Sequence, residues 1–161
     1  MLIQTRSFGE VNIEEERILD FPNGIIGFPD LKRFVLLHDS ERGESVGIHW
    51  LQSIEEPGFA MPVMDPLIVE SGYNPIIEDD ILTPLGDLSE DDTIVLVTVS
   101  VPKDLTKMTV NLRGPIVINA AKRKGCQVIV EGEDFSVRFP IYEILQKNKE
   151  KALNEAKEEK A

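Results

Sequence analysis

The side chains best suited to chemistry are two histidines, one cysteine and several runs of acids. His38 and His49 both fall in predicted strands, and neither belongs to a metal-ligand spacing such as HExxH. Cys126 follows a basic run at 122–124. Nearby positive charge can lower a thiol pKa, but chain position supplies no base that would make this cysteine a nucleophile. We therefore expect no catalytic residue and no metal ligand among these three side chains.

The acids form two dense triplets, which are Glu78, Asp79 and Asp80, and Glu90, Asp91 and Asp92. Neither triplet has the alternate spacing and the glycine of a calcium-binding EF-hand loop. The chain also lacks a glycine-rich phosphate loop and a GxSxG nucleophile elbow. The sequence thus predicts a protein that is not an enzyme and that has no metal or cofactor site.

The negative charge is concentrated in one part of the chain. The formal net charge is −12, and the stretch between Arg42 and Lys103 holds twelve acids without a single Lys or Arg. Such a surface repels phosphates and attracts basic protein surfaces. We expect no direct nucleic-acid binding, and we expect the two triplets to contact a partner. The alternative, that the acids only maintain solubility, stays open.

The composition predicts a soluble, cytoplasmic protein of one main domain. The chain has 161 residues and one cysteine, so no disulfide framework is available. Its first residues are polar and acidic, unlike a signal peptide. The longest apolar-rich run, Thr93 to Val101, is too short for a membrane span, which needs about 20 residues.

Short strand patterns separated by turn residues dominate the chain. The predicted strands are Arg33–Ser40, Gly47–Ile54, Thr93–Val101, Met108–Leu112, Gly114–Asn119, Gln127–Glu131 and Ser136–Phe139. Turns are expected at ERGE (41–44), KRKG (122–125) and EGED (131–134), and an irregular acidic segment at 66–92. This spacing is typical of an all-β fold. We expect a small antiparallel β-barrel-like domain over residues 1–140, followed by a C-terminal helix or charged tail over 141–161.

The stretch FPNGIIGFP, residues 21–29, combines apolar side chains with glycines and prolines that set backbone geometry. It predicts an apolar turn that folds onto the barrel, or else an exposed apolar edge for a partner. The expected core consists of Phe21, Ile25, Phe28, Val35, Trp50, Leu51, Ile94, Leu96, Val110, Ile116, Ile118 and Val128.

Three long segments resemble signature segments of the flagellar assembly factor FliW family. They are FPNGIIGFPDLKRFVLL, WLQSIEEPGFAMPVMDP and NLRGPIVINAAKRKGCQVIV, and they occur in the family's order. The resemblance implies structural signature residues at Phe21, Gly24, Gly27, Phe28, Pro29, Trp50, Gln52, Asp65, Pro66, Asn111, Pro115, Asn119 and Gln127. Within this set we expect Asn111, Asn119 and Gln127 to form hydrogen bonds with nearby main chain.

The resemblance also implies a function. FliW-like proteins bind flagellin and, when free of flagellin, bind and antagonise the RNA-binding translational repressor CsrA, which couples flagellin synthesis to flagellin export. For this chain we expect the same partners and a monomer. A rival interpretation from the residues is a barrel that binds a small ligand of the flavin type.

Overall fold

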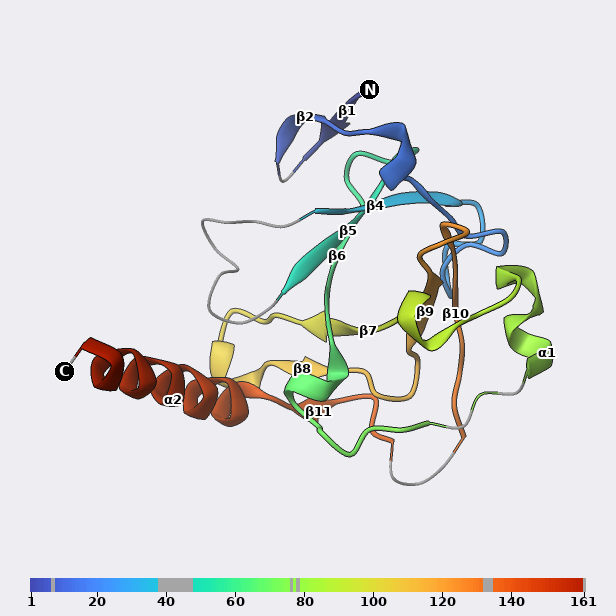
Figure 1. The fold of residues 1–161 in the computed structure, drawn as a ribbon. Coiled ribbons are helices and arrows are strands. Elements are labelled where there is room, and N and C mark those ends of the chain that lie inside the picture. Colours follow the sequence, from blue (N-terminus) through green and yellow to red (C-terminus); the bar gives the residue numbers. More distant parts are fainter. Residues whose placement is uncertain (7, 38–47, 76, 78, 132–134, 161) are drawn as a thin grey trace.

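The computed structural model describes residues 1–6, 8–37, 48–75, 77, 79–131 and 135–160, and it is an all-β barrel with a C-terminal helix (Figure 1). Seven strands form the closed ring. In ring order they are β7 (Thr93–Ser100), β6 (Ala60–Met64), β5 (His49–Ser53), β4 (Arg33–Leu37), β3 (Leu19–Asp20), β10 (Lys124–Gln127) and β9 (Ile116–Asn119). The predicted fold class is therefore confirmed.

The long strand β7 closes the ring because it pairs with different neighbours along its length. Its first half pairs with β9 from Thr93 to Leu96. Its second half pairs with β6 on one edge and with β8 (Thr109–Val110) on the other, and β11 (Phe139–Pro140) extends β8. The pairs around the ring are antiparallel except one, because β10 and β3 run parallel where Lys124 lies opposite Asp20.

A hairpin of β1 (Leu2–Thr5) and β2 (Gly9–Asn12) covers the outer face of the barrel (Figure 1, top). Ile3 and Ile13 bury against Val35 and Leu37 of β4 there. Our strand prediction did not include this hairpin, because its mixed polar and apolar sequence lacks the apolar runs of the other strands.

Three further clusters form the rest of the core. The barrel interior is filled by Leu19, Phe21, Ile25, Phe34, Leu51, Val63, Leu96, Ile116 and Ile118. One barrel end is closed by Tyr73, Met108, Leu112 and their neighbours, together with Ile141 and Leu145 at the base of α2 (Tyr142–Lys160). On the outer face, Val117 and Cys126 lie beneath Leu82, which ends the short helix α1 (Asp79–Leu82), and Leu85.

Most of the expected core residues are buried, but three are not. Phe28 is 47% exposed and Ile94 is 37% exposed, while Trp50 is half-buried beside the β1–β2 hairpin. The prediction was wrong for the first two for different reasons. Phe28 lies on the outer side of its turn, and Ile94 lies on β7 where β6 has already ended.

One strand was predicted in the wrong place. We expected a turn at 122–125 and a strand at Gln127–Glu131, whereas β10 spans Lys124–Gln127. The strand begins earlier because Gly125 lies against the Phe21 ring, where a Cβ atom would come within 2.5 Å of the ring carbon Cζ. The strand predicted at Ser136–Phe139 was wrong except for Phe139, which begins β11, and β3, β6 and α1 were not predicted. The expected turn at 41–44 and part of the one at 131–134 lie outside the described residues.

Candidate partner-binding surfaces

The turn at residues 21–29 is fixed by its own backbone. Gly24 has φ +67° and Gly27 has φ +89°, both in the left-handed region. A Cβ atom on Gly24 would lie 2.4 Å from the Phe28 carbonyl oxygen, whereas a Cβ atom on Gly27 would meet open space. Ile25 and Phe28 exchange backbone hydrogen bonds across the turn, at 3.3 and 2.7 Å. Glycine at 24 is thus required by both conformation and space.

The side chain of Gln127 joins this turn to the third family segment. Its Oε1 accepts a hydrogen bond from the Ile26 N–H at 3.0 Å. Its Nε2 donates to the Gly114 carbonyl at 3.0 Å. The amide therefore spans two loops that are far apart in the chain, and the expected hydrogen bonding of Gln127 to main chain is confirmed.

The 21–29 turn has apolar side chains both inside the barrel and on the surface. Phe21 and Ile25 are buried in the barrel, while Ile26 and Phe28 are exposed. The Phe28 ring packs against the Phe59 ring in a T-shaped arrangement, with ring centroids 4.7 Å apart. The exposed side of the turn and Ile81 of α1 line a shallow pocket of about 290 Å³.

Cys126 lines the same pocket. Burial raises the pKa of its thiol, which opposes formation of the reactive thiolate. The basic run at 122–124 therefore does not lower the pKa of the Cys126 thiol in this structure. Of the two histidines, His49 is half-buried in β5, and His38 lies outside the described residues.

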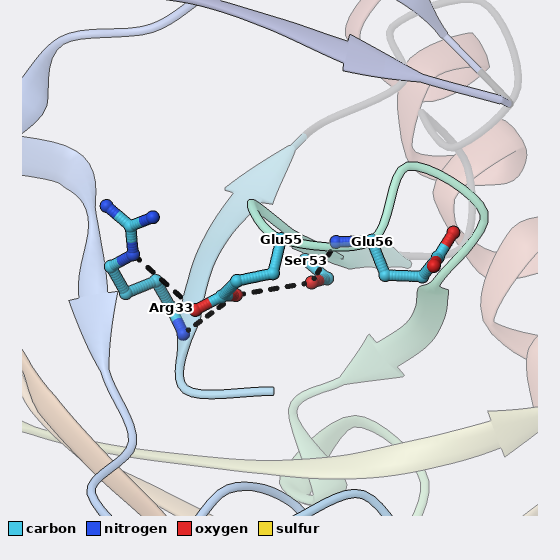
Figure 2. Close-up of polar contacts among 4 residues, drawn as sticks. All are labelled: Arg33, Ser53, Glu55 and Glu56. Carbon is cyan, nitrogen blue, oxygen red and sulfur yellow. Dashed lines mark hydrogen bonds and ion pairs between the residues drawn. The ribbon is translucent and has the colours of Figure 1, made fainter. Parts of the chain in front are cut away.

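The second family segment builds a polar turn after β5 (Figure 2). The Ser53 hydroxyl accepts a hydrogen bond from the Glu56 N–H at 3.0 Å. Glu55 reaches back to β4, where its carboxylate accepts from the Arg33 backbone N–H at 3.3 Å and pairs with the guanidinium at 3.5 Å. The buried Gln52 side chain donates to the Pro57 carbonyl at 3.3 Å. The contacts hold the turn to the barrel and involve no group poised for catalysis.

The two asparagines of the third segment hold loops in place. Asn119 is fully buried. Its Nδ2 donates to the Leu85 and Asp87 carbonyls at 2.8 and 3.0 Å, and its Oδ1 accepts from the backbone N–H groups of Ala121 and Lys122 at 3.1 and 3.2 Å. Asn111 accepts from two backbone N–H groups, those of Arg113 and Gly114, at 3.0 Å each. The expected main-chain hydrogen bonds of both residues are confirmed.

A larger groove lies beside the first half of β7, and we call it the β7 groove. It has a volume of about 420 Å³. One side consists of Thr93–Leu96, and the other of Asp65–Leu67 and residues 73–75 and 77. Ile94 and Leu67 are both exposed here, at 37% and 53%. The groove is mainly apolar and has Asp65 at its border.

The backbone of β7 along this groove is an open strand edge. The Asp92 and Thr98 carbonyls accept from Ala120 and Asn111, at 2.8 and 3.0 Å. Even-numbered residues of β7 therefore direct their polar groups toward β8 and β9, and odd-numbered residues direct theirs toward β6 and the groove, because strand polar groups alternate between edges. Val97 lies opposite Met64, the last residue of β6. Continued pairing would set Val95 opposite Pro66, which has no N–H and starts a 3₁₀ turn at Pro66–Ile68.

The predicted acidic site residues lie on two different elements. Asp79 and Asp80 begin α1, and Asp80 is exposed; Glu78 lies outside the described residues. Glu90–Asp92 form a 3₁₀ turn that leads directly into β7, with Glu90 and Asp91 exposed. Asp92 accepts a hydrogen bond from the Ser89 hydroxyl at 2.9 Å. The triplet at 90–92 is thus next to the β7 groove, while Asp80 directly precedes Ile81, which lines the pocket of the 21–29 turn.

Sequence reasoning missed the groove, although one signal for it was available. Pro66 lies two residues after the end of β6 at Met64, and a proline cannot donate a hydrogen bond to a neighbouring strand. A strand that ends at a proline beside a longer strand leaves part of the longer strand unpaired. The apolar character of Thr93–Val101 favoured burial on both sides and concealed this edge.

Comparison with known proteins identifies the family. The sequence profile of a family described as FliW protein matches residues 2–141. The chain belongs to the FliW family.

Close relatives match over nearly their whole length. The flagellar assembly factor FliW of Lachnoclostridium phytofermentans is 48% identical over 151 residues, which cover 94% of this chain and 97% of the relative. The FliW of Lachnospira eligens is 46% identical over 148 residues, with 91% and 98% covered. A crystal structure of the flagellar assembly factor FliW superposes with a TM-score of 0.79 at 31% identity, covering 88% of this chain and 96% of that one. The barrel described above is thus a FliW fold.

The described residues contain no helix that is both long enough and apolar enough to cross a bilayer. Within the same part of the chain, no three His, Cys, Asp or Glu side chains gather as a metal site would require.

Proposed function

We propose that this FliW family member is a non-enzymatic, monomeric cytoplasmic protein that binds flagellin and, when free of flagellin, binds and antagonises CsrA. The observation that carries the proposal is the family match over residues 2–141, supported by relatives of nearly equal length. The partners themselves come from the resemblance of the three segments to the family. The acidic, base-free stretch between Arg42 and Lys103 supports a basic partner.

Charge contributes to the antagonism in this proposal. CsrA-type repressors bind messenger RNA, so their RNA-binding face must be basic. An acidic protein docked beside that face places negative potential where phosphates would lie, and like charges disfavour the ternary complex. The effect reaches about 8 Å at physiological ionic strength, the Debye length. Asp80, Glu90 and Asp91 are exposed and suited to this role.

The central test is size-exclusion chromatography of the protein with CsrA, with and without flagellin. We expect the protein to co-elute with CsrA in the absence of flagellin, and flagellin to release CsrA from it. Failure to form either complex at micromolar concentrations would refute the proposal. Co-elution of all three proteins would refute the exchange of one partner for the other.

The charge mechanism has a matched test. One variant neutralises both triplets to Gln and Asn, while a control neutralises the exposed Glu14, Glu15 and Glu16, which precede the acidic stretch. We expect the first variant to associate with CsrA more slowly and to displace RNA less well, and raised salt to do the same to the unmodified protein. The control should lose less per charge removed. Equal RNA displacement by both variants and the unmodified protein at low salt would show that the acids serve solubility alone.

The rival flavin-type function has little room in the barrel. The interior residues Phe21, Phe34, Leu51 and Ile116 are all fully buried against one another and their neighbours. The visible absorbance of protein purified from cells tests this alternative, because a bound flavin makes a protein yellow.

A further inference from the structure

We propose that the open edge of β7 is a strand-addition site, where an extended segment of a partner protein pairs with residues 93–96. The segment carries apolar side chains at alternate positions and Lys or Arg at its ends. The inference rests on the backbone of β7 and on the groove beside it. It holds whichever protein supplies the strand, and so it stands apart from the flagellin and CsrA assignments.

The first support is the unpaired backbone. On the groove side of β7, the Thr93 N–H is used by the preceding 3₁₀ turn, where it donates to the Glu90 carbonyl. The Thr93 carbonyl and both polar groups of Val95 remain, and within the described part of the chain none of them has a hydrogen-bond partner on that edge. These groups are spaced as an incoming strand requires, because alternate residues of a strand share one edge.

The second support is the space beside this edge. A neighbouring strand lies about 4.8 Å away and projects its side chains to both faces. The β7 groove of about 420 Å³ lies directly against residues 93–96. Exposed Ile94 and Leu67 offer apolar contacts on its two sides. A natural edge is normally covered, shortened or charged to prevent such pairing, and this edge is bounded by acids alone.

The third support is the negative charge around the groove, which favours a partner segment with basic ends. Asp65 lies at the border of the groove, and exposed Glu90 and Asp91 immediately precede Thr93. No Lys or Arg occurs between residues 43 and 102 to balance them. A segment with basic ends gains attraction at this site, whereas an acidic segment is repelled. A second copy of this chain would place its own acids beside these acids, and the like charges would disfavour such a dimer.

The probe for the test is a blocked synthetic peptide, Lys-Val-Thr-Val-Thr-Val-Lys, added to the full chain. Amide hydrogen exchange followed by NMR reports the Val95 N–H directly. We expect saturating peptide to slow Val95 exchange at least about tenfold, because a buried hydrogen bond must open before exchange. The Leu96 N–H, which faces β9, should change little. An unaffected Val95 amide at every peptide concentration would overturn the proposal.

Two control peptides distinguish backbone strand pairing from nonspecific apolar or charged binding. Methylation of the three central amide nitrogens removes donors along both peptide edges and should abolish binding. Exchange of both lysines for glutamates should weaken binding at least tenfold at low salt. Equal affinity of the methylated peptide would overturn strand pairing, and equal affinity of the acidic peptide would overturn the basic occupant.

A protein variant tests whether the peptide binds in the β7 groove. Ile94→Arg puts a cation into the groove and should weaken the lysine-flanked peptide at least tenfold. Ile129→Arg is the control, because Ile129 is 57% exposed and lies outside the groove. Unchanged binding by the first variant would overturn the site. Self-association of the unmodified chain that protects Val95 without peptide would show that a second copy occupies the edge, and would equally overturn the proposal.

Discussion

The 21–29 turn and the β7 edge differ in how the backbone polar groups outside the strand pairs are satisfied. In the turn, the Ile25 and Phe28 backbones pair with each other and Gln127 occupies the Ile26 N–H. At the edge, β6 ends at Met64 and Pro66 stands where a partner for Val95 would be, so the polar groups of Val95 face a groove. The turn has the conspicuous sequence and the edge has an ordinary one. The glycines and the buried apolar residues of the turn thus serve the scaffold, while the open strand edge lies in a part of the sequence without conspicuous residues.

The largest expected effect comes from Gly24→Ala in the turn. The new Cβ atom would lie 2.4 Å from the Phe28 carbonyl oxygen at φ +67°, so we expect a loss of about 2–5 kcal/mol in the free energy of unfolding. Gly27→Ala is the control, since it has a positive φ but open space, and it should cost only about 1–2 kcal/mol. Urea denaturation measures both. Equal losses would mean that the turn is less rigid than its contacts indicate.

A somewhat smaller effect is expected for Asn119→Ala. The substitution removes the partner of two carbonyls and two backbone N–H groups, and leaving buried groups unpaired should cost about 2–3 kcal/mol in the free energy of unfolding. Asn111→Ala, in a half-buried site with two bonds, should cost about 1 kcal/mol. If Asn119→Ala kept full thermal stability but lost partner binding, this residue would belong to the binding surface and the division between scaffold and surface would fail.

Tyr73, on the far side of the β7 groove, links stability to alkaline pH. Its hydroxyl donates to the Leu112 carbonyl at 2.6 Å, and burial raises its pKa from 10.0 to about 12. The folded state thus retains this proton where the unfolded state loses it, so stability is full below pH 10 and falls as the pH rises toward 12. Tyr73→Phe should cost about 1 kcal/mol at neutral pH and should flatten this fall. Chemical denaturation at several pH values provides the comparison, and an unchanged slope would contradict the burial of this hydroxyl.

The smallest effect is expected at the edge itself. Ile94 is 37% exposed, so Ile94→Ala should change the free energy of unfolding by no more than about 0.5–1 kcal/mol. The midpoint of thermal unfolding should accordingly change by a few degrees at most. A loss above about 2 kcal/mol, which is roughly the smallest cost of truncating a fully buried isoleucine, would mean that the edge is covered by the protein itself.

The sequence was sufficient for the strands that carry their own pattern. Strands were predicted at 33–40, 47–54 and 93–101 from apolar and β-branched runs, and each range contains a strand of the barrel, namely β4, β5 and β7. The side chains of Asn111, Asn119 and Gln127 also form the main-chain hydrogen bonds that were predicted for them. Local composition is informative wherever a strand's own residues decide its burial.

Other features depended on contacts with distant parts of the chain. The start of β10 depends on the Phe21 ring packed against Gly125, which chain order does not reveal. Phe28 and Ile94 are as apolar as their buried neighbours, and only the positions of the turn and of the end of β6 expose them. The sequence also did not reveal that Asp79 and Asp80 begin α1 while Glu90–Asp92 lead into β7.

The parallel pairing of β3 with β10 has a consequence for how the chain folds. Lys124 must find Asp20, and Gln127 must find Ile26, a partner 101 positions earlier. Most other ring pairs join strands closer together along the chain, so the ring stays open until this last long loop closes. Such long-range pairing gives a high contact order, which slows folding. During synthesis, the first five strands of the ring therefore leave the ribosome before β10 does. Until the segment around residue 125 has emerged, the ring cannot close and the Phe21 side of the barrel stays uncovered.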